Sequence, residues 1–314
     1  MLDFINPIAL IRYLIVWRVT SPIVLLPRCF PIELTMILGK LIENNLPSQQ
    51  SREWRKTLTN QTPRWPVETV IFFPYLSGKR AYGKGELIIW ELKLIGESAD
   101  HGLFLELILP AMEKAATIRD HALRGRRNLW SRFDIQAIYV ARGRMWEPLV
   151  DKGKLNTDYR PTPTQWMDGL TLGESTRRGY RYFHWITPFE FISNHENDPA
   201  AGVGPSLKNI FNALMTRMTI FLPGKNESQR IQEVWALLSP TEQSKIEWAL
   251  QQEGSQPLVQ QEALQSPPKE WPGQKIGVQA FQDITPSLFP YLELASILHI
   301  GEHVRLGCGT FVLT

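Results

Sequence analysis

The stretch GELIIWELKLI, at residues 85–95, is a long strand signal from which the fold of the first half of the chain can be worked out. Its apolar residues partly alternate with polar ones, as expected of a β-strand with one buried face. Residues 67–73 predict another strand just upstream, and a turn is expected between the two at residues 77–79. These two strands form the middle of a longer pattern.

Upstream of this pair, the sequence predicts strands followed by a helix. Residues 13–17 and 23–26 read as strand material on either side of a turn. A helix is then expected from Pro31 to about residue 44, because proline is tolerated in the first helical turn and Glu33 favours the positive end of the helix dipole. Residues 49–66 are polar and contain prolines, and we expect them to form a loop.

Downstream of the pair, the sequence predicts a second helix and a closing strand. Asp100 is a suitable N-cap for a helix over residues 102–122, which Pro110 should kink. Residues 132–140 alternate cleanly between apolar and polar side chains, which indicates a strand. The order through residue 140 is therefore β-α-β-β-α-β, and it predicts a ferredoxin-like domain.

The rest of the chain repeats this pattern less clearly. Residues 141–178 are rich in proline, threonine and glycine, as is typical of a connector. We therefore expect a first domain at residues 1–145, a connector at 146–178 and a second domain at 179–314. The second domain is predicted from a strand at 180–186, a helix at 206–222, one or two helices at 227–253 broken near Ser239, a linker at 255–274, a strand at 277–281 and a short helix or turn at 287–295. The predicted fold class is α+β, with two tandem ferredoxin-like (RRM-like) domains and antiparallel sheets.

Composition and charge limit the classes of protein that this chain can be. Hydrophobic residues make up 43% of the 314 residues, which supports real cores and argues against disorder. The net charge is +3 and the pI is near 8.8, values compatible with a nucleic-acid partner. Cys29 and Cys308 are the only cysteines, so the sequence has neither a disulfide framework nor a four-cysteine metal site. A reduced, cytoplasmic setting is expected.

The apolar stretch at residues 8–26 invites comparison with a membrane anchor. Arg12, Arg18 and Pro22 interrupt it, and a charge near the centre of a bilayer costs about 2.5–3.5 kcal/mol. No small-residue cleavage site follows, so the stretch does not resemble a signal peptide either. We expect a buried strand region instead of an anchor.

The last sixteen residues, HIGEHVRLGCGTFVLT, admit two chemical interpretations. His299, Glu302 and His303 match the zinc-peptidase pattern H-x-x-E-H. That pattern needs a helix to place both histidines on one face, whereas Gly301 lies inside it and costs a helix about 1 kcal/mol. The other interpretation is a glycine-rich turn whose backbone can lie close to a phosphate chain. We favour the turn, and we expect neither a metal nor a cofactor.

Two arginine-rich runs are candidates for contact with RNA. Residues 119–132 hold five arginines and one acid, and arginine pairs bidentately with phosphates and stacks on bases. The alternative for this run is a solvated loop at the end of a helix. At residues 177–185 arginines are interleaved with aromatic residues, as in a stacking platform, although half of the rings should face a core. The RNA-binding candidates are Arg124, Arg126, Arg127, Arg177, Arg178, Arg181, Gly301, Arg305, Gly307 and Gly309.

Two of the six histidines are candidates for proton transfer, although any single histidine is more often structural. His121 is the first candidate, because it directly precedes the run ALRGRR at residues 122–127. A histidine beside phosphate-binding arginines could move a proton to or from a ribose 2′-oxygen or a 5′-leaving oxygen. His303 is the second candidate, because it lies in the terminal glycine-rich segment close to Arg305.

Several patches of the sequence resemble the CRISPR precursor-RNA processing endoribonucleases of the RAMP superfamily. The strongest follow the order of that family's C-terminal strand, helix and glycine-rich loop. They are GVQAF at 277–281, PSLFPYL at 286–292, HIG at 299–301 and LGCG at 306–309. Further matches are YGKGEL at 82–87, LKLIG at 92–96, LRGRR at 123–127 and ITPFEF at 186–191.

The resemblance implies two ferredoxin-like domains that bind the stem-loop of a CRISPR repeat RNA. It also implies metal-independent cleavage, in which the ribose 2′-hydroxyl attacks the adjacent phosphate and leaves a 2′,3′-cyclic phosphate. Many members carry a catalytic histidine in or near the first helix, whereas residues 28–46 contain none and the first histidine here is His101. The acid–base work could have moved to His121, or arginines could drive cleavage.

Three functional hypotheses follow. The leading one is a repeat-RNA endoribonuclease, with CRISPR repeat RNA or crRNA as its partner. The second is a non-catalytic crRNA-binding subunit of a CRISPR effector complex, in contact with other subunits. The third is a zinc hydrolase built on His299 and His303.

Overall fold

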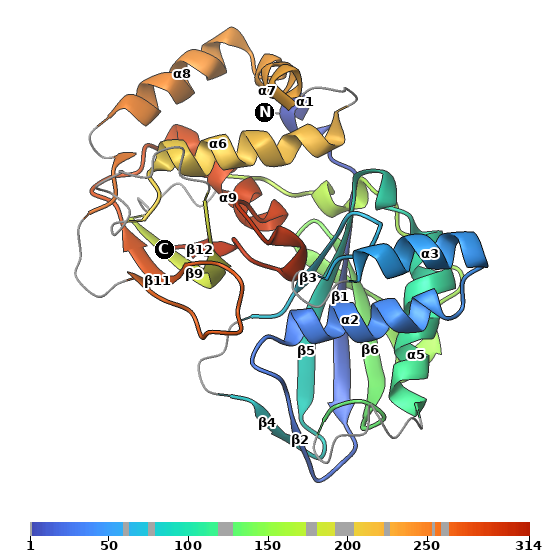
Figure 1. The fold of residues 1–314 in the computed structure, drawn as a ribbon. Helices are drawn as coiled ribbons and strands as arrows, with labels where there is room; N and C mark the ends of the chain where they lie inside the picture. Colours follow the sequence, from blue (N-terminus) through green and yellow to red (C-terminus); the bar gives the residue numbers. More distant parts are fainter. Residues whose placement is uncertain are drawn as a thin grey trace. The chain divides into compact units, whose positions relative to one another are not determined.

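The chain folds into two compact units in the computed structural model, which describes residues 2–58, 63–74, 79–118, 128–173, 181–191, 204–222, 227–252, 255–258 and 264–314 (Figure 1). The N-terminal unit is Ala9–Leu170. The C-terminal unit is Thr171–Thr314 together with Met1–Ile8. Among the described residues, no helix combines the length and the apolar content that crossing a bilayer requires.

An antiparallel sheet organises the N-terminal unit, in the order β3-β5-β1-β6-β7-β8. If β1, β3, β5 and β6 are numbered one to four along the chain, their order across the sheet is second, third, first, fourth. The predicted β-α-β-β-α-β order is confirmed. The strands are β1 Leu10–Val19, β3 Thr69–Phe72, β5 Leu87–Ile95, β6 Phe133–Arg142, β7 Met145–Asp151 and β8 Lys154–Leu155, and a separate ribbon pairs β2 Ile23–Leu25 with β4 Ala81–Gly83.

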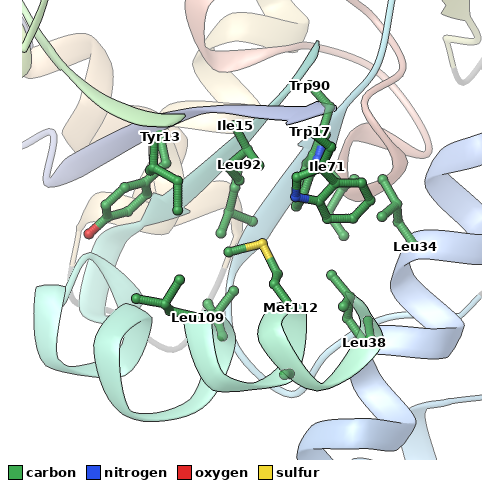
Figure 2. Packing of buried hydrophobic residues seen from close by; sticks show 14 of the residues in the cluster. Tyr13, Ile15, Trp17, Leu34, Leu38, Ile71, Trp90, Leu92, Leu109 and Met112 are labelled. Atoms are coloured by element: carbon green, nitrogen blue, oxygen red, sulfur yellow. The ribbon is translucent and has the colours of Figure 1, made fainter. Parts of the chain in front are cut away.

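Helices α2 (Phe30–Glu43) and α5 (Leu109–Thr117) cover one face of this sheet (Figure 1). Successive side chains of a strand point to opposite faces, so every second residue of β1 and β5 enters the core. Figure 2 shows these side chains meeting those of the two helices. Each fully buried apolar side chain contributes about 1.5–3 kcal/mol. The labelled core residues are Tyr13, Ile15, Trp17, Leu34, Leu38, Ile71, Trp90, Leu92, Leu109 and Met112.

The structure differs from prediction at the segment expected to be a loop, residues 49–66. Residues Ser48–Thr57 form helix α3, whose side chains are mostly polar. Its one buried side chain, Trp54, packs against Trp65, with ring centroids 5.7 Å apart. A single aromatic anchor holds this helix, so the sequence lacks the repeated apolar spacing that normally indicates one.

The expected connector at residues 146–178 also differs from the structure. Its first residues belong to β7, which pairs with β6 and buries Leu149 and Val150. The strand was not predicted because Pro148 interrupts its sequence: proline cannot donate a hydrogen bond to a neighbouring strand and is found mainly at sheet edges and bulges. Pro148 lies opposite Tyr139, directly beside a shift in the β6–β7 register. The bulge thus accommodates the proline.

The second predicted helix contains the expected irregularity near Pro110. It begins with α4 (His101–Leu103), with Asp100 as its N-cap: the Asp100 side chain accepts a hydrogen bond from the Gly102 backbone N–H. A π-helical turn, Phe104–Ile108, follows before α5. Such a turn is one of the recognised causes of a helix kink. Pro110 follows this turn as the second residue of α5.

The C-terminal unit has the same strand order in a smaller antiparallel sheet, β10-β11-β9-β12. If β9 to β12 are numbered one to four along the chain, their order across the sheet is again second, third, first, fourth. Helices α6 and α9 pack together through Phe211 and Tyr291, whose ring centroids are 5.7 Å apart. The elements are α1 Leu2–Ile5, β9 Tyr182–Phe189, α6 Leu207–Met218, α7 Glu227–Ala236, α8 Pro240–Gln251, β10 Leu264–Gln265, β11 Lys275–Ala280, α9 Phe289–Leu298 and β12 Phe311–Leu313.

Candidate nucleic-acid interface

The glycine loop, defined here as residues 299–309, is fixed to the end of strand β9. The Gly309 N–H donates to the Pro188 carbonyl at 2.9 Å, and the Glu302 N–H donates to the Glu190 carbonyl at 2.8 Å. Gly301 and Gly309 both have positive φ, +88° and +77°. A Cβ atom added at Gly301 would clash with the carbonyl oxygen of Glu190, and a Cβ atom added at Gly309 would clash with the carbonyl oxygen of Ile300. The loop therefore needs these glycines for close approach to its own chain.

Gly307 supports the same loop from within. It has a φ of +77° and ends the short 3-10 turn Val304–Leu306. Gly307 and Gly309 are buried, and Gly301 is half-buried. The atoms that crowd Gly301 and Gly309 are backbone atoms of this chain, which explains both glycines without RNA. The assignment of the three glycines to RNA binding therefore stays a prediction.

His299 has a structural position that is incompatible with the zinc-peptidase geometry. Helix α9 ends at Leu298, and both His299 and His303 have positive φ, so no helix places them on one face. The His299 Nδ1–H donates to the carbonyls of Gly307 and Cys308, each at 3.1 Å. In the described part of the chain, no three His, Cys, Asp or Glu side chains gather in a way that could hold a metal ion. The geometry contradicts the zinc hypothesis.

His303 and Arg305 lie on the accessible part of the glycine loop. The side chain of His303 is 31% exposed, and its Nε2 lies 3.6 Å from the Glu190 Oε2. An ion pair forms there whenever the imidazole is protonated. Arg305 is half-buried in the adjacent 3-10 turn. The structure thus brings these two predicted site residues into one loop.

Strand β9 separates its aromatic residues between two faces of the sheet. Phe183 and Trp185 are buried, whereas Tyr182 is 43% exposed and His184 is half-exposed. The expectation that half of these rings belong to the core is confirmed. The Trp185 indole N–H donates to the Gln279 side chain at 3.2 Å, which explains how its polar atom is accommodated.

What we call the open sheet face consists of Tyr182 and His184 of β9, Val278 of β11 and Val312 of β12. The register places Val312 and Val278 on either side of His184, across three strands. The Tyr182 and His184 rings lie beside each other, with centroids 6.5 Å apart. The exposed Arg181 directly precedes them. A ring and an imidazole on an accessible sheet face are suited to stacking on bases, and an exposed guanidinium next to the strand is suited to pairing with phosphate.

The other predicted site residues lie outside the described residues. His121, Arg124, Arg126 and Arg127 belong to the connection between α5 and β6, and Arg177 and Arg178 precede β9. Their roles stay predictions.

A hydrogen-bonded pair of titratable side chains, neither of them among the predicted site residues, lies in the N-terminal unit. The Tyr13 hydroxyl lies 3.0 Å from the His101 Nδ1, and its ring stacks on Phe104 with centroids 3.9 Å apart. Burial raises the pKa of Tyr13, and burial lowers the pKa of His101 although Asp100 opposes that shift. The two residues are 88 positions apart, so no local motif could have paired them.

Glu33 is a second polar residue, which the sequence analysis assigned only to a favourable position in the helix dipole. Its carboxylate accepts a hydrogen bond from the Trp130 indole N–H at 2.6 Å. Burial raises the pKa of Glu33, and the bond from Trp130 only partly opposes the shift. A carboxyl in the first turn of the first long helix can therefore hold a proton at higher pH than usual.

Neither protein-family models nor curated protein sequences match this chain. Solved structures do match. A chain of a partial Cas6-RT-Cas1–Cas2 complex is similar over 97% of this chain, with a TM-score of 0.53 and 12% identity, and a chain of a Cas6-RT-Cas1–Cas2 complex gives the same values. This chain spans 46% and 28% of those two chains. A Thermus thermophilus Cas6 is similar over 98% of this chain, with 14% identity and a TM-score of 0.47. The likeness to the two complexes establishes a shared fold, as the sequence resemblance had predicted.

Proposed function

We propose that this chain is a Cas6-type protein with two tandem ferredoxin-like domains, which binds CRISPR repeat RNA and cleaves precursor RNA in the cytoplasm. The observation that carries the proposal is the strand order second, third, first, fourth in both sheets. A chain of known Cas6 complexes has the same overall fold over 97% of this sequence. The glycine loop and the open sheet face add surfaces suited to RNA in the C-terminal unit.

The proposed reaction needs no group beyond the RNA and protein side chains. The ribose 2′-oxygen attacks the adjacent phosphorus, and the bond from phosphorus to the 5′-oxygen breaks. A base accepts the 2′-hydroxyl proton, and an acid donates a proton to the departing 5′-oxygen. The products are a 2′,3′-cyclic phosphate and a 5′-hydroxyl. Donors held by the protein stabilise the charge that develops on the phosphate oxygens.

His121 and His303 remain the candidates for proton transfer. The Glu190 carboxylate lies 3.6 Å from the His303 Nε2. We expect His121→Ala to slow single-turnover cleavage far more than it weakens RNA binding. An unchanged rate would remove His121 from the mechanism.

A non-catalytic RNA-binding subunit is the second candidate function. The observation that favours it is the first long helix, Phe30–Glu43, which contains no histidine. In that case the chain would hold the repeat RNA within a larger assembly, and other subunits would be its protein partners.

Incubation of the purified chain with a labelled repeat stem-loop RNA in EDTA tests the proposal. We expect cleavage that leaves a cyclic phosphate and is abolished by a single 2′-deoxy substitution at the scissile position. Tight, salt-sensitive binding without cleavage would support the second candidate. Failure to bind the stem-loop would overturn both. Replacing Arg126 and Arg127 together should weaken binding and flatten its salt dependence.

A further inference from the structure

Trp248 on α8 is the most exposed aromatic side chain in the part of the chain that the structure describes, with 59% of its surface accessible. Large rings normally gain by burial, so such exposure calls for an explanation. Helices α7 and α8 stand between α6 and β10 and are additional to the β-α-β-β-α-β cycle. They are not needed to complete the sheet, and they can carry a binding surface.

One face of α8 presents Trp248 together with polar side chains. Thr241, Ser244, Lys245 and Trp248 stand at positions i, i+3, i+4 and i+7, the spacing of residues that share one face of a helix. All four are exposed. Helix α8 is held to its unit by other residues, Ile246 and Ala249, which are buried. The exposed face is therefore not required for packing of the helix.

A hollow of about 490 Å³ lies along this face. It is lined by Thr241, Ser244, Lys245 and Trp248 from α8 and by Ser287 from the turn before α9. Its volume is within the range of small-ligand sites, roughly 300–1,000 Å³. The lining combines an indole ring, an ammonium group and three hydroxyls, and none of these five residues is acidic.

We propose that this hollow binds one unpaired nucleotide of an RNA, with its base stacked on Trp248 and its phosphate bound by Lys245 and the neighbouring hydroxyls. Charge complementarity favours this occupant, because an ammonium and hydroxyl donors match a phosphate. A ring with an open face accepts any base. A protein hot spot would instead surround the ring with apolar contacts that exclude water. The proposal rests on the proposed function and extends it to single-stranded RNA beyond the stem-loop.

Binding of two RNAs to the full chain separates this proposal from the proposed function. One RNA is the repeat stem-loop with blunt ends, and the other carries an eight-nucleotide unpaired uridine flank. Dissociation constants are measured for the wild type, Trp248→Ala, Trp248→Phe and Lys245→Ala. Met145→Ala removes an exposed apolar side chain from the N-terminal unit and serves as the control.

We expect the flank to tighten binding by the wild type and Trp248→Ala to weaken binding of the flanked RNA about tenfold, as loss of one stacked base predicts. Trp248→Phe should retain most of the affinity, Lys245→Ala should lose part of it, and the blunt stem-loop should bind all variants equally. A flank advantage that survives Trp248→Ala overturns the nucleotide site alone. An equal loss for both RNAs also overturns it, because the effect would then not depend on the flank. If the wild type binds neither RNA, the proposed function itself fails.

Discussion

The two units share one strand order but present different chemistry at matching places in their sheets. In the N-terminal unit, the face opposite the helices carries Arg12 on the first strand and Glu91 and Lys93 on the third. In the C-terminal unit, the first strand carries Tyr182 and His184 at the accessible face. The shared order therefore does not decide where RNA binds, and the side chains of each sheet do.

The ionic cluster of the N-terminal unit shows how strongly the two faces differ. Arg12 donates to the Glu91 carboxylate at 2.6 Å, and the Lys93 ammonium lies 3.9 Å from the same carboxylate. The Glu91 and Lys93 side chains are only 7% and 3% exposed. The Arg12 guanidinium also lies 5.3 Å from the centre of the Trp146 ring. In the N-terminal sheet these charged groups therefore pair with one another, whereas the rings of the open sheet face in the C-terminal unit are accessible.

The largest expected effect comes from replacing a glycine whose missing Cβ the C-terminal unit requires. Gly309→Ala should destabilise the protein by about 4 kcal/mol or more, because the new Cβ clashes with the Ile300 carbonyl oxygen and the φ of +77° is strained for alanine. Gly153→Ala in the N-terminal unit is the matched control, with a φ of +76° and open space around the new Cβ. Gly153→Ala should lower the free energy of unfolding only by the cost of placing alanine in the left-handed region, about 1–2 kcal/mol. Thermal and urea unfolding measure both, and equal losses would contradict the role of the clash.

The next largest effect concerns the ionic cluster. Glu91→Ala should destabilise the protein by about 3–5 kcal/mol, because Arg12 and Lys93 lose the carboxylate that compensates them. The exposed pair of Arg18 and Asp134 lies on the same sheet, with side chains 49% and 55% exposed. Asp134→Ala should therefore change the stability by less than about 1 kcal/mol. Similar losses in urea unfolding would show that the cluster has no special role.

The pH dependence of stability gives a separate test of Glu91. Burial alone would raise its pKa, but the charges of Arg12 and Lys93 outweigh burial and hold the pKa below its ordinary value. A carboxyl whose folded pKa is depressed stabilises the protein above its unfolded pKa, near 4.3, and loses this contribution as pH falls through the lower folded value. The wild type should therefore lose stability below about pH 4, and Glu91→Gln should lose less over that range. Parallel curves for the two proteins would contradict the assignment.

A smaller effect is expected at the open sheet face. Tyr182→Ala should weaken binding of the repeat RNA by about five- to tenfold, which is near the lower end for loss of one stacked base. Tyr182→Phe should bind almost as the wild type does, because the ring is kept. Ile89→Ala in the N-terminal sheet is the matched control, since Ile89 is 45% exposed, and it should change affinity little. A greater loss for Ile89→Ala would reverse the comparison.

The smallest effect concerns the cap of the additional helix α8. The Ser239 hydroxyl accepts from the Glu242 N–H, and the Glu242 carboxylate accepts from the Ser239 N–H, which together form a capping box. Ser239→Ala should cost about 1 kcal/mol of stability. If α8 supports only the nucleotide site, the affinity for the blunt stem-loop should not change.

The parts of the fold that could be predicted are those with repeated spacing of apolar residues. Apolar and polar residues alternate in part along strands β5 and β6, and α6 shows a helical spacing, so these elements followed from local patterns. Helix α3 and strand β7 were missed because a single tryptophan and a proline at a bulge govern them. Local periodicity does not contain that information.

The candidate site was predictable to the same extent. Alternation along β9 correctly assigned half of its rings to the core. The neighbours of the functional side chains could not be predicted, because they are distant in sequence. The Glu190 carboxylate contacts His303. The carbonyls of Ile300 and Glu190 leave no room for a Cβ at Gly309 and Gly301, which is why glycine is required at both positions. These contacts depend on how the glycine loop returns to the end of β9.

Ultraviolet cross-linking of bound repeat RNA, followed by mass spectrometry of the attached peptides, tests the central claim most directly. The claim is that the C-terminal unit contacts RNA through its open sheet face and glycine loop. We predict cross-links at Tyr182 or His184 and at residues 301–305, with their yield reduced in Tyr182→Ala. The claim would be contradicted if RNA at saturation gave no cross-link in these segments and instead gave cross-links at residues 87–89, on the sheet of the N-terminal unit.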